Sequence, residues 1–124
     1  MDLVFADREL DVMTVLWETG SATVAEVQAR LADPLAYTTV LTVLRTLEEK
    51  GFVGHTEEGR AHRYHPLVEQ ADARKSAAKR LVSRVFADSP ELLLAHLVSD
   101  RRLSEAQLRR IRKLLDDRLK EEDR

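Results

Sequence analysis

The sequence predicts a mainly α-helical chain with one β-hairpin near its middle. Apolar residues recur at helical spacing through most of the 124 residues. Residues 52–65 differ, because β-forming and aromatic residues flank a Glu-Gly turn there. This length suits one domain or two small units. The change of pattern after the hairpin predicts a first domain over residues 1–67 and a helical region over residues 68–124.

Capping residues mark the first two helices. An apolar stripe and an acidic first turn predict a helix over residues 6–19, which Gly20 ends. Thr23 then begins a second helix, and Glu26 three residues later predicts a capping box. The pair Asp33-Pro34 stops this helix, because the residue before a proline avoids helical backbone.

A third helix over residues 37–50 combines a buried stripe with an unusual exposed face. The residues of the buried stripe are Val40, Val43, Leu44 and Leu47. Gly51, which follows the helix, suits a left-handed cap. The opposite face holds four threonines with a leucine and an arginine beside them: Thr38, Thr39, Thr42, Thr46, Leu41 and Arg45. Threonine costs roughly a few tenths of a kcal/mol relative to alanine in a helix. Short hydroxyls and methyls suit base edges and phosphates in a DNA major groove, and an ordinary exposed face is the alternative.

The hairpin follows this helix directly. Two segments, residues 52–57 and 60–65, flank the turn Glu58-Gly59. A hairpin placed after three short helices is the order of a winged helix-turn-helix. The tip of this wing carries Arg60, and the returning strand carries His62 and Arg63.

Three more helices are predicted after the wing. The first covers residues 69–87, the second follows Ser89-Pro90, and the last begins near Ser104. Their apolar stripes are large for so short a region, which favours two copies packing together as a homodimer over a monomer with its tail folded back. The predicted dimerisation residues are Leu81, Val85, Phe86, Leu93, Leu97, Leu108, Ile111 and Leu115.

Charge is unevenly distributed along the chain. Residues 1–66 hold six Lys or Arg and eleven Asp or Glu, whereas residues 67–124 hold fourteen and eleven. A net negative charge opposes DNA binding, since phosphate neutralisation supplies much of the affinity. DNA binding by the first region therefore requires its acids to face away and Arg45, Arg60 and Arg63 to cluster.

An enzyme is not predicted. The chain has no glycine-rich phosphate loop, no nucleophile motif and no cysteine. His62 and His65, with His55 nearby, resemble metal ligands, but strand residues three apart point to opposite faces. We therefore expect no metal and no cofactor.

A cytoplasmic protein without membrane insertion is expected. No apolar run approaches the ~20 residues of a membrane span. The first residues lack the basic and apolar regions of a signal peptide, and the absence of cysteine fits a reducing compartment.

Several segments together resemble the penicillinase-repressor family (BlaI/MecI/CopY type). They are residues 9–17, 36–47, 50–53 and 59–64, and a weaker similarity continues from Phe86 to Leu115. The resemblance implies a winged-helix repressor that dimerises through its C-terminal helices and binds a palindromic operator. It implies that the groove-facing residues are Thr38, Thr39, Leu41, Thr42 and Thr46, and that Arg60 and Arg63 meet phosphate. Arg45 and His62 complete the predicted DNA-binding set, and a winged helix used only for protein–protein contact is the alternative function.

Two departures from the family pattern concern release from DNA. The resemblance implies a membrane sensor-protease as a further partner, which triggers cleavage at an Asn-Phe bond in the β-lactamase branch. His96-Leu97 stands at the corresponding place here. The cysteine-rich motif of the copper-responsive branch is excluded, because the chain has no cysteine.

Overall fold

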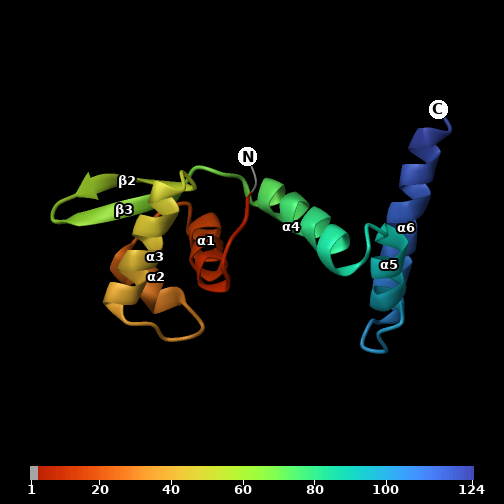
Figure 1. The fold of residues 1–124 in the computed structure, drawn as a ribbon, viewed down its shortest axis with the longest axis horizontal. Coiled ribbons are helices and arrows are strands. Elements are labelled where there is room, and N and C mark those ends of the chain that lie inside the picture. The colour runs from red at the N-terminus through yellow and green to blue at the C-terminus, as the bar shows by residue number, and fades with distance from the viewer. Residues whose placement is uncertain (1–2) are drawn as a thin grey trace. The chain divides into compact units, whose positions relative to one another are not determined.

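A computed structural model describes residues 3–124 and confirms a mainly helical chain with one hairpin (Figure 1). The elements follow in the order α1 (Asp7–Thr19), β1 (Ala22–Thr23), α2 (Val24–Arg30), α3 (Tyr37–Glu49), β2 (Val53–Glu58), β3 (Ala61–Pro66), α4 (Gln70–Val85), α5 (Pro90–Val98) and α6 (Glu105–Glu122). The two-residue strand β1 was not predicted. It pairs antiparallel with β3, which gives the sheet the order β1-β3-β2.

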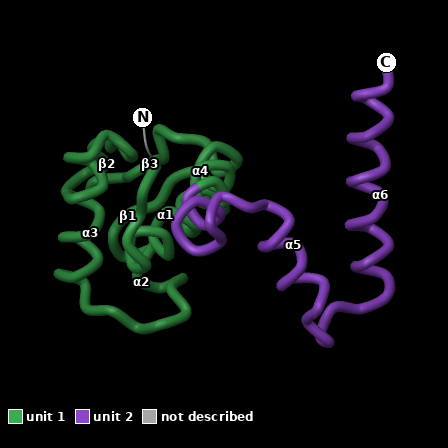
Figure 2. The backbone as a smooth tube through the Cα atoms, turned by 45° about the vertical axis from the view of Figure 1, so that its right-hand side comes forward, with its two compact units in different colours: residues 1–79 green, residues 80–124 purple. Residues whose placement is uncertain are grey.

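The chain divides into two compact units, one ending at Lys79 and the other beginning at Arg80 (Figure 2). The division falls within α4, because Ala73 near the start of this helix is buried in the core of the first unit. The functional boundary after residue 67 stays a prediction.

The core of the first unit lies between α1, α2, α3 and the sheet. Val40, Leu44 and Leu47 of α3 are fully buried, as predicted, whereas Val43 is half-buried at the margin of the core. Tyr64 of β3 enters the same core, where it is 1% exposed. Gly51 ends α3 with φ +82°, a left-handed backbone that only glycine adopts without strain.

Aromatic contacts tie the two ends of this unit together. The Phe5 ring lies 6.1 Å from that of Trp17 and 4.9 Å from that of Phe52, between ring centres. Trp17 Nε1 donates a hydrogen bond of 2.9 Å to the Val68 carbonyl oxygen. The segment that leaves the wing is thereby held against α1.

Side-chain caps begin α5 and α6, and the cap at Ser89 was predicted. The Ser89 hydroxyl accepts a hydrogen bond from the Leu92 N–H, and Pro90 occupies the first turn of α5. Ser104 and Gln107 form a reciprocal capping box at the start of α6. The helix predicted to run to residue 87 stops at Val85, because Ala87 and Asp88 adopt left-handed φ angles of 50° and 60°.

A buried carboxylate joins α1 to the end of α3. Glu9 is 6% exposed and accepts a hydrogen bond of 2.8 Å from the Ala6 N–H. Lys50 Nζ donates to both carboxylate oxygens, at 3.1 and 2.9 Å. Burial by itself would raise the pKa of Glu9, but the hydrogen bonds from Lys50 and Ala6 and the Lys50 charge lower it below the ordinary value.

We expect Glu9→Gln to lower the free energy of unfolding by about 1–3 kcal/mol at pH 7, because a buried charge-assisted hydrogen-bond network is broken. The lowered pKa means that ionised Glu9 stabilises the fold above its unfolded-state pKa, and that this contribution is lost as pH falls through the folded-state pKa. The difference in the free energy of unfolding between the variant and the wild type should therefore shrink in acid.

Urea unfolding followed by the fluorescence of Trp17, the single tryptophan, measures this difference. Glu49→Gln is the matched control, since Glu49 is exposed and forms no ion pair within residues 3–124. An equal effect of the two substitutions at pH 7 would contradict the role of Glu9.

Candidate nucleic-acid interface

Helix α3 presents its threonine face to solvent, opposite the core. Thr38, Thr42 and Arg45 are exposed, and the flanking residues Thr39, Leu41 and Thr46 are half-buried. Leu41 also packs partly against the core, so its side chain is shared between the interior and the surface. The predicted threonine face is therefore available to a partner along about two and a half turns of helix, from Thr38 to Thr46.

The Thr42 hydroxyl has a defined role within this face. Its Oγ1 donates a hydrogen bond of 2.9 Å to the Thr38 carbonyl oxygen one turn earlier. A hydroxyl has one donor and two lone pairs, so Thr42 offers a partner acceptor positions and its methyl group. Amino groups of cytosine or adenine and the methyl group of thymine are the matching features of a major groove.

The wing has two chemically different faces. In the β2–β3 register, His55 is opposite Tyr64 and Glu57 is opposite His62, so these side chains share one face. Arg63 is opposite Thr56 and lies on the other face. Arg60 lies in the exposed turn between the strands.

A histidine stack joins the first face to α3. The rings of His55 and His62 are parallel within 7°, with their centres 4.2 Å apart. His55 Nδ1 lies 2.5 Å from Glu48 Oε2, on the last turn of α3. His62, which is predicted to lie near phosphate, is the exposed member of this pair of rings, and His55 is half-buried. Within residues 3–124, no three His, Asp or Glu side chains are grouped to hold a metal ion.

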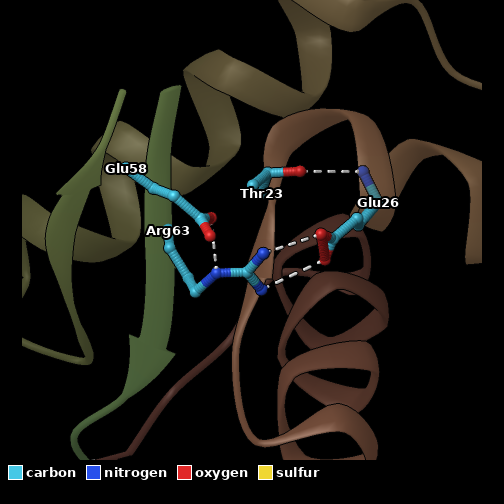
Figure 3. Close-up of polar contacts among 4 residues, drawn as sticks. All are labelled: Thr23, Glu26, Glu58 and Arg63. Carbon is cyan, nitrogen blue, oxygen red and sulfur yellow. Dashed lines mark hydrogen bonds and ion pairs between the residues drawn. The ribbon is translucent and has the colours of Figure 1, made fainter. Parts of the chain in front are cut away.

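Arg63 is held by two carboxylates on the second face (Figure 3). Its Nη2 and Nη1 donate to Glu26 Oε1 and Oε2 at 2.9 and 3.2 Å, and its Nε donates to Glu58 Oε2 at 2.8 Å. The hydrogen bonds from Arg63 lower the pKa of Glu26. The capping box predicted at Thr23 is present in part. Thr23 Oγ1 accepts from the Glu26 N–H at 3.3 Å, and a backbone hydrogen bond from Thr23 also helps to lower the pKa of Glu26. The Glu26 carboxylate is held chiefly by Arg63.

These ion pairs decide which cations of the first unit are available. Lys50 is held by Glu9, and Arg63 by Glu26 and Glu58. Arg45 and Arg60 are exposed and form no ion pair with any residue between 3 and 124. The sequence did not predict the Glu26–Arg63 pair, because Glu26 lies 37 residues before Arg63 and no local spacing connects them.

The predicted dimerisation residues lie mostly on the surface. No residue from 80 to 124 is fully buried. Three of the predicted residues are half-buried: Phe86, Leu93 and Ile111. The other five predicted residues are exposed: Leu81, Val85, Leu97, Leu108 and Leu115. Two further leucines of α6, Leu114 and Leu119, are exposed as well. None of the helices in residues 3–124 is both long and apolar enough to span a bilayer.

Comparisons with known proteins agree with this architecture. Residues 5–117 match the family described as penicillinase repressor. The chain is 25% identical to the penicillinase repressor of Bacillus licheniformis, over 90% of this chain and 89% of that protein. It is 36% identical to the transcriptional regulator BlaI of Mycobacterium tuberculosis, over 70% of this chain and 78% of that protein.

A solved structure supports the same assignment. The DNA-binding domain of the repressor BlaI, determined in solution, aligns with a TM-score of 0.52 at 32% identity. The alignment covers 58% of this chain and 90% of that domain. With a family match over most of its length, the chain belongs to the penicillinase repressor family.

Proposed function

We propose that this chain is a transcriptional repressor that binds a palindromic operator as a homodimer. The observation that carries the proposal is the division of α3 into a buried face and an exposed threonine face. A helix with this division, followed by a hairpin, is suited to enter the major groove while the wing lies along the backbone. Membership of a family whose named members are repressors supports the same role.

Contacts to DNA are assigned by chemistry. Thr38, Thr39, Leu41, Thr42 and Thr46 face the base edges, with Leu41 suited to a thymine methyl. Arg45, Arg60 and His62 lie beside phosphates, where cations supply affinity that depends on salt concentration. Arg63 is held by Glu26 and Glu58, so it does not join Arg45 and Arg60 in the cluster expected from the sequence. The availability of Arg45 and Arg60 alone supports the assignment, against the net negative charge of residues 1–66.

The homodimer is proposed from the apolar surface of residues 80–124. Leucine side chains lie exposed along α6, including Leu115 at 48% and Leu119 at 62%. Burying such side chains stabilises an assembly by about 25 cal/mol per Å² of apolar surface. Two copies joined in this way would present two α3 helices to two half-sites of one operator.

Release from DNA concerns the part of α5 where the family's Asn-Phe pair is replaced. His96 and Leu97, which replace the Asn-Phe pair, lie inside α5 and are exposed. A protease acts on locally opened chain, so cleavage here by a sensor-protease system would require α5 to unwind first. We place the protein in the cytoplasm, where an operator would be accessible, and assign it no catalytic activity.

Selection of bound duplexes from a random pool tests the proposal as a whole. We expect a palindromic consensus with half-sites about one helical turn, or a multiple of it, apart. The logarithm of the binding constant for the selected duplex should fall linearly with the logarithm of the salt concentration. Recovery of no preferred duplex would instead favour a winged helix used for protein–protein contact.

Thr42→Ala should change the preference among operator variants by about 1 kcal/mol or more, because it removes an acceptor and a methyl from the groove face. Competition binding against single-base-pair variants of the selected duplex measures this change. Thr14→Ala is the matched control, since the Thr14 hydroxyl makes the same contact to a carbonyl one turn earlier on α1. Equal base preferences in both variants would refute base readout by Thr42.

Arg60→Ala should weaken binding to all duplexes by a similar factor. Losing one phosphate contact per protomer should flatten the slope of log affinity against log salt by about 0.9 for each bound protomer. Titrations at several salt concentrations measure the slope. Arg8→Ala, at an exposed position in the first turn of α1, should leave it unchanged. A loss confined to one sequence would contradict the phosphate role.

Ile111→Asp should give monomers in sedimentation velocity and abolish operator binding, because a charge would be buried in the proposed interface. Ala106→Asp introduces the same charge on the opposite side of α6, near its N-terminus, and should leave the dimer intact. A dimer that persists in Ile111→Asp would remove this residue from the interface.

A further inference from the structure

The wing tip lacks the support that its base receives. Strand β1 pairs with β3 only at Ala22–Tyr64 and Thr23–Arg63. Beyond Arg63, toward the tip, Ala61 and His62 of β3 pair only with β2. A two-stranded ribbon is marginally stable by itself and varies widely in twist. The direction in which this tip carries Arg60 therefore needs a further constraint.

Arg63 lies at the last position where the third strand supports the wing. Its guanidinium spans from Glu26 in the first turn of α2 to Glu58, which is opposite Ala61 at the end of the hairpin (Figure 3). Three of its five N–H groups are used, and the contact to Glu26 is bidentate. A planar guanidinium held in this way fixes direction as well as distance.

We propose that Arg63 is a positioning residue, which clamps the wing to α2 so that Arg60 reaches the DNA backbone. Arg63 then acts through Arg60 instead of binding phosphate as the sequence predicted. This role rests on the proposed function of the chain. We name the contact among Glu26, Glu58 and Arg63 the wing clamp.

The two roles of Arg63 predict opposite effects when Glu26 is neutralised. If Arg63 bound phosphate, Glu26→Gln would release it and strengthen binding. If Arg63 clamps the wing, the same substitution loosens the tip and weakens binding. Removing any acid near DNA also lowers general repulsion, so a charge-matched control is needed.

Glu57→Gln is this control. Glu57 neighbours Glu58 but lies on the opposite face of the wing and forms no ion pair within residues 3–124. We expect Glu26→Gln to bind the selected operator about tenfold more weakly than Glu57→Gln at equal salt. Glu26 is exposed, so both variants should fold, which circular dichroism and Trp17 fluorescence verify.

A double-mutant cycle with Arg60 separates positioning from an independent contact. If the clamp serves Arg60, Arg63→Ala and Arg60→Ala are non-additive. The double variant should then match Arg63→Ala within about twofold in affinity and share its salt slope. Two independent phosphate contacts would instead multiply the losses and flatten the slope by about 0.9 for each residue per protomer.

The free protein offers a test without DNA. Gly59 lies at the wing tip, and its backbone amide order parameter reports motion there. Glu26→Gln should lower this order parameter, whereas Glu57→Gln should not. Three results would each overturn the clamp and leave the proposed function intact. They are an unchanged order parameter of Gly59 in Glu26→Gln, tighter DNA binding by Glu26→Gln, and additive affinity losses in the Arg60→Ala and Arg63→Ala cycle. A wild-type chain that binds no duplex would overturn both.

Discussion

The contact between Glu9 and Lys50 is the constraint on which the first unit depends. Within residues 3–124, Glu9 is the one charged side chain that is buried. It caps the start of α1 through Ala6 and holds Lys50, one residue after α3 ends. A buried charge is tolerated only when it is paired and hydrogen-bonded, so Glu9 holds the end of α3 beside the start of α1.

Ion pairs also separate the cations of the winged helix into paired and unpaired ones. Lys50 and Arg63 are used to hold helices and strands, and both have carboxylate partners. Arg45 and Arg60 have none among the residues that the structure describes, although the region is acidic overall. An acidic sequence is therefore compatible with DNA binding when a few cations remain exposed and unpaired. Net charge by itself is a poor guide to the electrostatics of a surface.

The second unit follows a different physical logic. Its helices are well capped, but its leucines stay exposed, with Leu114 at 70%. Local hydrogen bonds are satisfied within each helix, whereas the apolar surface has no core within residues 80–124. Helices of this kind gain most of their stability from packing, so this unit is expected to gain its stability from association. The left-handed backbone at Ala87 and Asp88 separates α4 from α5 and sets where the apolar stripes are interrupted.

Local patterns in the sequence determined the helices, the hairpin and the threonine face of α3. Caps such as Ser89, and Gly51 after α3, act within a few residues, so spacing alone reveals them. Only the tertiary structure decided the pairs Glu9–Lys50 and Glu26–Arg63, because their members lie 41 and 37 positions apart in the chain. A carboxylate near a helix start can cap its own helix or bind a distant cation. Which contact dominates depends on the side chains that the fold brings within reach.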